Sequence, residues 1–294
     1  MSRKVTIAAA AYAPDYHDDW SGLAAKLERW VVDAAGQGAG LLVFPEYGSE
    51  AGLVGACPRD AEAYVWAEHM ARDTDVYVGL LTELAKRHSV YILTASGVVA
   101  TEDRLVNRAH LIGPDGRVAH QDKVILTPFE RNEMRVQPGE TLSVFETEIG
   151  SLGILICYDS EFPILARNLV EAGAEILLVP SATEFPAGFT RVRQSARARA
   201  IENQCLVIHS PVLGRLADCD ILDGGTGRVG FFCPPDYGLP PDGILAQGAM
   251  DEPGWTIAEV DLDAVSAART SGQVGNFGHW PEQMRFGRPD KVRI

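Results

Sequence analysis

The sequence has few cysteines, and their spacing fits neither a disulfide framework nor a zinc site. Its 294 residues include five cysteines, at positions 57, 157, 205, 219 and 233, without any Cys-x-x-Cys pair. Disulfide-stapled domains carry even, closely spaced sets of cysteines, and structural zinc sites need paired cysteines or histidines. The sequence therefore predicts free thiols, no metal and a reducing, cytoplasmic environment.

Long apolar runs and an excess of positive charge are also missing. No apolar run approaches the roughly 18 to 20 residues that a membrane-spanning helix needs. Asp and Glu number 40 against 26 Lys and Arg, which gives a formal net charge of -14. Because nucleic acids and anionic membranes repel such a chain, we expect neither as a partner. The expected ligand is a small molecule.

Short apolar runs alternate with helical patterns along most of the chain. The runs occupy residues 5–13, 40–46, 90–99, 108–113, 152–159, 174–182, 204–212 and 256–262. Apolar stripes or segments between strands predict helices over 21–37, 75–88, 160–173 and 189–203. This order predicts an α/β fold, and the turn sequence "PDGR" at 114–117 predicts an antiparallel hairpin within it.

No linker or internal repeat divides the chain, so residues 1–270 are expected to form one domain. The last segment, 271–294, is rich in Gly, Arg and aromatic residues and shows no helical or strand period. We expect it to form an arm that packs on a second copy of the chain, in a homodimer or a larger homo-oligomer.

Three polar residues follow apolar runs, at the positions where open α/β sheets bind their ligands. They are Glu46 after "GLLVFP", Lys123 after the predicted hairpin, and Cys157 after "GILI". Each alone has an ordinary explanation, as a cap, a solvated side chain or a buried filler. Together they supply a thiol nucleophile, a base for its proton and a cation for a developing oxyanion, which is a complete set for acyl transfer.

The segments around these residues resemble the nitrilase superfamily of carbon-nitrogen hydrolases, whose Glu-Lys-Cys triad occurs in this order. The matching stretches are "FPE" at 44–46, "KVILTPFE" at 123–130 and "CYDSEFP" at 157–163, within a resemblance over roughly residues 5–262. The resemblance implies a four-layer α-β-β-α sandwich, with Glu46 as general base, Lys123 as oxyanion stabiliser and Cys157 as nucleophile. It implies no metal or organic cofactor.

The resemblance also implies a second glutamate near the lysine and a backbone donor for the oxyanion. Glu130 is the expected glutamate, although the usual pattern places a glycine before it and shifts it by one residue, so Glu133 is an alternative. The N–H of Tyr158, directly after the nucleophile, is the expected oxyanion donor.

The residues after Cys157 bear on the substrate. "Cys-Tyr-Asp" resembles the amidase and carbamoylase branches, whereas nitrilases usually carry tryptophan after the cysteine. We therefore expect hydrolysis of an amide or N-carbamoyl group through a Cys157 thioester. The motifs most resemble a little-characterised subgroup that is sometimes fused to an acetyltransferase domain. The alternatives are nitrile hydrolysis on the same triad and a catalytically silent oligomeric binding protein on this scaffold.

Three more residues are candidates for contact with the substrate. Thr183 and Glu184 follow the strand expected next to that of Cys157, and Arg191 lies in the next helix. Glu184 would favour a cationic substrate and Arg191 a substrate carboxylate. The two signals conflict, and the sequence leaves the substrate open.

Overall fold

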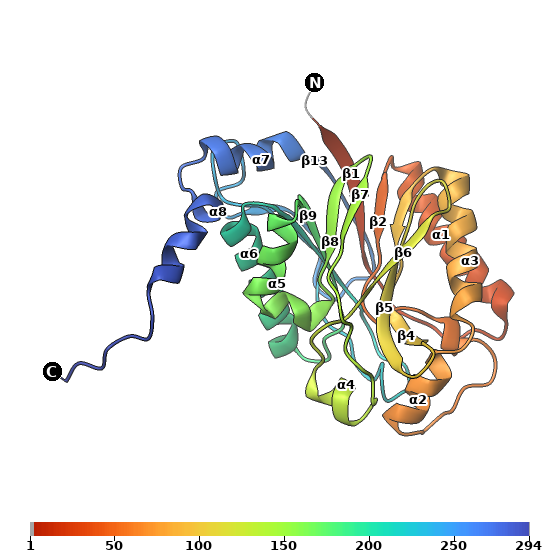
Figure 1. The fold of residues 1–294 in the computed structure, drawn as a ribbon. Helices are drawn as coiled ribbons and strands as arrows, with labels where there is room; N and C mark the ends of the chain where they lie inside the picture. Colours follow the sequence, from red (N-terminus) through yellow and green to blue (C-terminus); the bar gives the residue numbers. More distant parts are fainter. Residues whose placement is uncertain (1–2, 294) are drawn as a thin grey trace.

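Strands and helices alternate through most of the computed structural model, which describes residues 3–293 (Figure 1). The strands are β1 (Lys4–Ala11), β2 (Leu41–Val43), β3 (Tyr91–Leu93), β4 (Gly97–Ala100), β5 (Leu105–Ile112), β6 (Val118–Asp122), β7 (Val144–Thr147), β8 (Gly150–Ile154), β9 (Ile176–Ser181), β10 (Leu206–Pro211), β11 (Gly230–Phe232), β12 (Ile244–Gln247) and β13 (Gly254–Asp261).

Helices connect or follow these strands. The α-helices are α1 (Trp20–Gly36), α2 (Ala63–Met70), α3 (Thr74–His88), α4 (Pro128–Asn132), α5 (Pro163–Glu171), α6 (Pro186–Asn203), α7 (Leu262–Ser271) and α8 (Asn276–His279), and the 3-10 helices are η1 (Ala51–Leu53), η2 (Cys157–Glu161) and η3 (Trp280–Arg285). The four predicted helices correspond to α1, α3, α5 and α6, so the predicted α/β fold is confirmed. Among residues 3–293, no helix combines the length and the apolar composition that crossing a bilayer requires.

The strands form two sheets. The first has seven strands, in the order β13-β1-β2-β3-β5-β4 with β6 paired to β5, and the second has six, in the order β12-β11-β10-β9-β8-β7. Strands β1, β2 and β3 are parallel to one another, as are β8, β9 and β10. The carboxyl ends of parallel strands lie at one edge of their sheet, where ligands bind in open α/β folds.

Strand β1 shows why the two sheets stack. Its alternate side chains point to opposite faces, and from Ile7 to Ala11 both faces are apolar and buried. Ile7 and Ala9 pack in the core shared with the second sheet, and Ala8 and Ala10 pack against the helical layer that includes Leu23 of α1. A strand that is apolar on both faces is stable only between two other layers.

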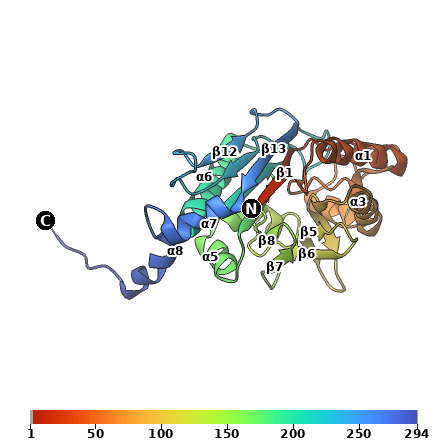
Figure 2. The same cartoon turned by 90° about the horizontal axis from the view of Figure 1, so that it is seen from above.

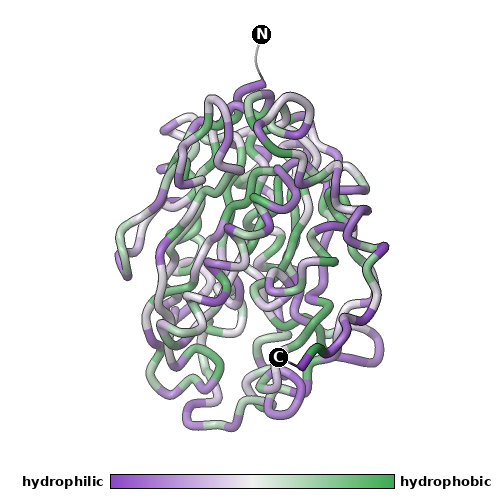
Figure 3. Tube along the Cα trace, turned by 90° about the vertical axis from the view of Figure 1, so that its left-hand side faces the viewer, coloured by the Kyte–Doolittle hydropathy of each residue, from purple (hydrophilic) through white to green (hydrophobic). Residues whose placement is uncertain are grey.

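The helices complete the predicted four-layer α-β-β-α sandwich. Helices α1 and α3 cover the outer face of the first sheet, and α5 and α6 cover the outer face of the second (Figure 2). The hydrophobic stretches concentrate in the interior strands, and the hydrophilic ones in outer turns and helix surfaces (Figure 3).

The predicted hairpin is confirmed, but the single strand predicted over 90–99 is two strands. Strands β5 and β6 pair antiparallel, as "PDGR" indicated. Between β3 and β4 the backbone of Ser96 forms hydrogen bonds with the loop after β2. Ser96 N–H donates to Pro45 O at 3.0 Å, and its carbonyl accepts from Ser49 N–H at 3.2 Å. The interruption therefore anchors the loop that carries Glu46.

The sequence predicts an irregular C-terminal segment, but part of this segment is helical in the structure. Helix α7 ends at Ser271, and α8 and η3 follow. Arg167 of α5 lies over the rings of Phe277 and Trp280, at 4.2 and 5.0 Å from the ring centroids. Residues 286–293 are exposed and extend away from the body of the molecule (Figure 1). That this arm packs on a second copy stays a prediction, as does the division at residue 270.

Candidate active site

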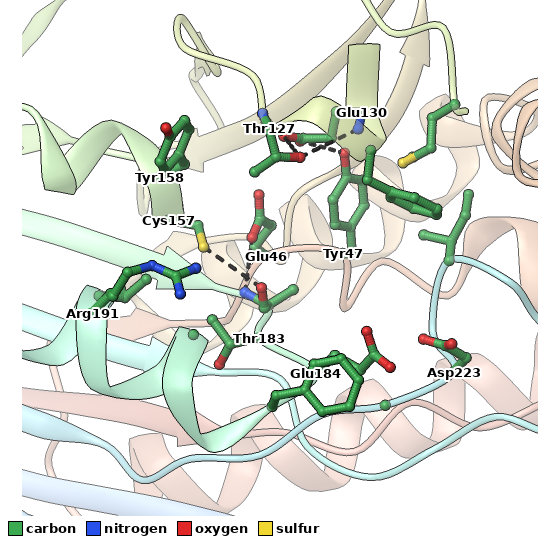
Figure 4. A pocket seen from close by; sticks show the side chains of 18 of the residues that line it. Glu46, Tyr47, Thr127, Glu130, Cys157, Tyr158, Thr183, Glu184, Arg191 and Asp223 are labelled. Atoms are coloured by element: carbon green, nitrogen blue, oxygen red, sulfur yellow. Dashed lines mark hydrogen bonds between the residues drawn. The ribbon is translucent and has the colours of Figure 1, made fainter. Parts of the chain in front are cut away.

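The carboxyl ends of strands from both sheets meet at one pocket of about 420 Å³. Glu46 follows β2 of the first sheet, Lys123 follows β6 of the same sheet, and Cys157 follows β8 of the second. All three side chains line the pocket, and Figure 4 shows Glu46 and Cys157 facing into it. The two stacked sheets thus bring together residues that lie 77 and 34 positions apart.

Lys123 lies between two carboxylates and is almost entirely buried. Its Nζ is 2.7 Å from Glu46 Oε1 and 2.9 and 2.8 Å from the two oxygens of Glu130. Burial by itself lowers the pKa of Lys123, but the carboxylates of Glu130 and Glu46 outweigh it and raise the pKa well above its ordinary value. The ammonium group therefore stays charged through the neutral range.

Glu130 is fixed by the start of helix α4. Thr127 and Glu130 form a capping box, in which Glu130 Oε2 accepts from the Thr127 N–H at 2.8 Å. Tyr47 Oη also donates to Glu130 Oε1, at 2.7 Å. Burial raises the pKa of Glu130, but Lys123 and these donors outweigh it, so the pKa is lowered overall. The carboxylate is therefore held in its charged form.

Glu133 is placed differently from Glu130. It caps the C-terminal end of α4, is exposed and is not among the residues that line the pocket. The structure thus brings Glu130, rather than Glu133, to Lys123. The spacing Thr-x-x-Glu in "TPFE" is a capping-box signature, which indicates Glu130 as the residue that caps the start of α4.

Glu46 accepts hydrogen bonds at both of its oxygens. Oε1 accepts from Lys123 and, at 3.0 Å, from Asn107 Nδ2, and Oε2 accepts from the Ala182 N–H at 2.8 Å. Burial raises the pKa of Glu46 above its usual value, although the Lys123 ammonium opposes this. A carboxylate with a raised pKa is better matched to accepting a proton from a thiol.

Cys157 lies beyond the end of its strand, in the turn that begins η2. Strand β8 ends at Ile154, and Cys157 has φ +48°, in the left-handed region that non-glycine residues rarely adopt. Its Sγ contacts Ala182 O at 3.6 Å, and 5% of the residue is exposed. Burial and the nearby Glu46 carboxylate raise the pKa of the thiol well above its ordinary value. The resting group is therefore the thiol, which needs a base to become a nucleophile.

Asp159 holds the Cys157 turn against the Lys123 loop. Its carboxylate accepts from the N–H groups of Ile156, Val124 and Ile125, at 3.2, 3.3 and 2.7 Å. Burial raises its pKa to about 7. One side chain thus fixes the backbone before the nucleophile and the backbone after the lysine.

The expected oxyanion donor has a suitable position. Tyr158 lines the pocket directly after Cys157. Within residues 3–293, its N–H donates to no other protein atom, because the first bond of this turn is made by the Asp159 N–H to Ile156 O. A free N–H beside the nucleophile is the geometry that stabilises a tetrahedral oxyanion.

The predicted substrate-contact residues lie on the pocket wall. Thr183, Glu184 and Arg191 all line it, and Thr183 Oγ1 also donates to Thr226 O at 3.2 Å. Arg191 Nε is 3.5 Å from Glu161 Oε1. Among residues 3–293, no three His, Cys, Asp or Glu side chains are grouped as metal ligands.

Four groups that hold the site together could not be recognised in the sequence. Asn107, Tyr47, Asp159 and the Ala182 N–H all bond to the residues described above. Asn107 is a fully buried polar residue of strand β5, and buried polar side chains need partners. The other three depend on contacts between distant segments.

Comparisons with known proteins agree with this architecture. A family model described as carbon-nitrogen hydrolase matches residues 6–270. The chain is 36% identical over 201 residues to the probable hydrolase YhcX of Bacillus subtilis (strain 168), which covers 68% of this chain and 39% of that protein. It is 28% identical over 253 residues to the chloroplastic omega-amidase of Arabidopsis thaliana, covering 82% of this chain and 64% of that one. The chain thus spans less than two thirds of the length of these relatives.

Two solved structures share the fold. The Saccharomyces cerevisiae protein Nit3, a member of branch 10 of the nitrilase superfamily, superposes with a TM-score of 0.75 at 22% identity, covering 97% of this chain and 98% of that one. An amidase from Nesterenkonia sp. superposes with a TM-score of 0.71 at 23% identity, covering 92% and 94%. At these identities the likeness shows the fold alone. Since the family model spans most of the sequence, the chain belongs to the carbon-nitrogen hydrolase family.

Proposed function

We propose that this protein hydrolyses the carbon-nitrogen bond of a linear amide or N-carbamoyl compound through a thioester on Cys157. The observation that carries the proposal is the buried contact of Glu46 with Lys123 in the pocket that also holds the Cys157 thiol. Amide hydrolysis within the family is supported by relatives named as amidases and omega-amidases.

In the first half of the reaction, Glu46 accepts the Cys157 proton as the sulfur attacks the carbonyl carbon. The developing oxyanion is stabilised by the Lys123 ammonium and the Tyr158 N–H. When the tetrahedral intermediate collapses, the C–N bond breaks, and protonated Glu46 gives its proton to the leaving ammonia or amine. The acyl group remains on Cys157 as a thioester.

In the second half, Glu46 removes a proton from water, which attacks the thioester carbonyl. The C–S bond then breaks, the carboxylic acid leaves, and the proton returns to the Cys157 sulfur. Lys123 stabilises the second oxyanion as it did the first. Glu130 keeps Lys123 in place, because it binds the ammonium through both of its oxygens.

The test is ammonia release from a panel of primary amides, N-carbamoyl amines, N-carbamoyl amino acids and nitriles, together with the mass of the protein. A slow amide should add its acyl mass at Cys157, and Cys157→Ala should abolish both the adduct and turnover. Cys57→Ala is the matched control, because Cys57 is a free cysteine outside the pocket. Turnover by Cys157→Ala, or release from nitriles alone, would contradict the proposal.

A further inference from the structure

The pocket that holds Cys157 has an uneven balance of charge. Its lining includes six carboxylates and two cationic side chains. Lys123 is enclosed by Glu46 and Glu130, which both bind its ammonium group. The charged side chains that remain on the pocket wall are Glu161, Glu184, Asp220, Asp223 and Arg191.

Arg191 is already paired within the pocket. Its Nε is 3.5 Å from Glu161 Oε1, and its side chain is 63% exposed. This ion pair neutralises the charge of Glu161 with that of Arg191, the cationic side chain besides Lys123 among the described residues that line the pocket. Because Arg191 is paired with Glu161, it attracts a substrate carboxylate less strongly than an unpaired arginine would.

The other three carboxylates lack such partners. Within residues 3–293, Glu184, Asp220 and Asp223 form no ion pair within 4.0 Å and accept no hydrogen bond from a side chain. Burial and then the neighbouring Asp223 raise the pKa of Glu184, and Arg215 opposes them without forming an ion pair. Two unpaired carboxylates close together repel each other, and a cation between them relieves that repulsion.

The two carboxylates are held at a defined place in the pocket. In Figure 4 the side chains of Glu184 and Asp223 lie at the opposite side of the pocket from Tyr158, Cys157 and Arg191. A Cβ atom on Gly224 would lie 2.7 Å from Glu184 Cγ. Because residue 224 is glycine, the Glu184 side chain packs directly on the loop that carries Asp223.

We propose that the pocket selects an amide whose acyl part carries a cationic group, an ammonium or guanidinium, bound by Glu184 and Asp223. The pocket itself is defined by the buried reactive groups, and Glu184 and Asp223 lie on the wall opposite Cys157. The inference rests on the proposed function, since it assumes that the amide carbon is attacked by Cys157. The group that the wall recognises is then the end of the acyl chain remote from the scissile bond.

The test compares three amides of similar length that differ in the charge of the far end. They are 6-aminohexanamide, which is cationic, heptanamide, which is neutral, and adipamate, which is anionic. We expect kcat/KM for ammonia release to be about tenfold or more higher for the cationic amide than for the neutral one, and lowest for the anionic one. This preference should weaken as salt is added, because the wall is open to solvent. Equal values, or a preference for heptanamide or adipamate, would overturn the proposal.

Variants locate the source of the preference. The double variant Glu184→Gln/Asp223→Asn should lower kcat/KM for 6-aminohexanamide about tenfold and change that for heptanamide less than about threefold. The matched control, Glu146→Gln/Glu148→Gln, removes two exposed carboxylates on and beside β7, away from α4 and the pocket (Figure 1). If the control lowers the preference as much as the pocket variant does, the effect is one of net charge, and the proposal is wrong.

Binding separates this inference from the proposed function. The affinity of Cys157→Ala for each amide is measured by calorimetry, where no turnover is needed. If no amide is hydrolysed but 6-aminohexanamide binds more tightly than heptanamide, the charge selection holds and the proposed reaction fails. If the amides are hydrolysed without a charge preference in rate or binding, the reaction holds and the charge selection fails.

Discussion

Glutamine in place of Glu46 changes one oxygen of the buried network and removes the proposed base. Glu46 Oε1 accepts from Lys123 and Asn107, at 2.7 and 3.0 Å, and Oε2 accepts from the Ala182 N–H at 2.8 Å. Every partner is a donor. A glutamine must therefore turn its NH₂ group towards a donor in either orientation.

The cost to stability follows from these contacts. The less unfavourable orientation places the NH₂ group against the Ala182 N–H, which leaves one buried donor without an acceptor and costs about 1–3 kcal/mol. Lys123 keeps both oxygens of Glu130, at 2.9 and 2.8 Å, so the larger cost of an unpaired buried charge, about 3–5 kcal/mol, is avoided. We expect the free energy of unfolding to fall by about 1–3 kcal/mol and the fold to persist.

The cost to activity is larger. Without a general base the thiol keeps its proton, and kcat/KM should fall by about 10² to 10⁴. Stability is measured by urea unfolding and activity by ammonia release. The matched control is Glu133→Gln, because Glu133 is an exposed carboxylate outside the pocket. It should change kcat/KM by less than about twofold and the free energy of unfolding by less than about 0.5 kcal/mol. Activity of Glu46→Gln within threefold of the wild type would refute the assigned role of Glu46.

Three further outcomes are expected. In a pH profile, kcat/KM should fall as the pH drops through the raised pKa of Glu46, because only its carboxylate accepts the thiol proton; an acid limb at or below the ordinary value of 4.5 would contradict this. Asp159→Asn should lower kcat more than it changes KM, and also the melting temperature, because an amide offers one acceptor oxygen to three backbone N–H groups; an unchanged kcat would count against its positioning role. Truncation after residue 270 should reduce the number of subunits in the oligomer, as measured by light scattering. An unchanged number of subunits would contradict the prediction that the arm packs on a second copy.

The prediction of the fold succeeded where the physical signal is local. Apolar residues on both faces of a strand such as β1 require a layer on each side, and helical stripes such as that of α1 supply the outer layers. The prediction was wrong where the conformation of a short segment depends on hydrogen bonds to a segment distant in the sequence. The break between β3 and β4 is one example, because Ser96 bonds to the loop after β2 and not to a strand.

The site divides in the same way. Glu46 and Cys157 were recognised in sequence because each follows an apolar run, and Lys123 because it follows the predicted hairpin. All three lie in family-like motifs. Asn107 and the Ala182 N–H were not, since both bond to Glu46 and Asn107 also bonds to Glu130, and these glutamates belong to distant segments. Hydrogen bonds between remote segments leave no periodic pattern in the sequence.

By itself, the sequence determined that the chain is α/β, that it carries a thiol, a carboxylate and an ammonium group in family order, and that it has a strongly acidic charge. The fold class and the charge follow from local composition and spacing, which depend only on neighbouring residues, and the order of the three groups is what the family resemblance implies. The tertiary structure decided that Glu130 binds Lys123, that Arg191 is paired with Glu161, and that Glu184 stands beside Asp223 on the pocket wall. Only folding brings such distant groups within reach of one another, and electrostatic interactions depend on that separation.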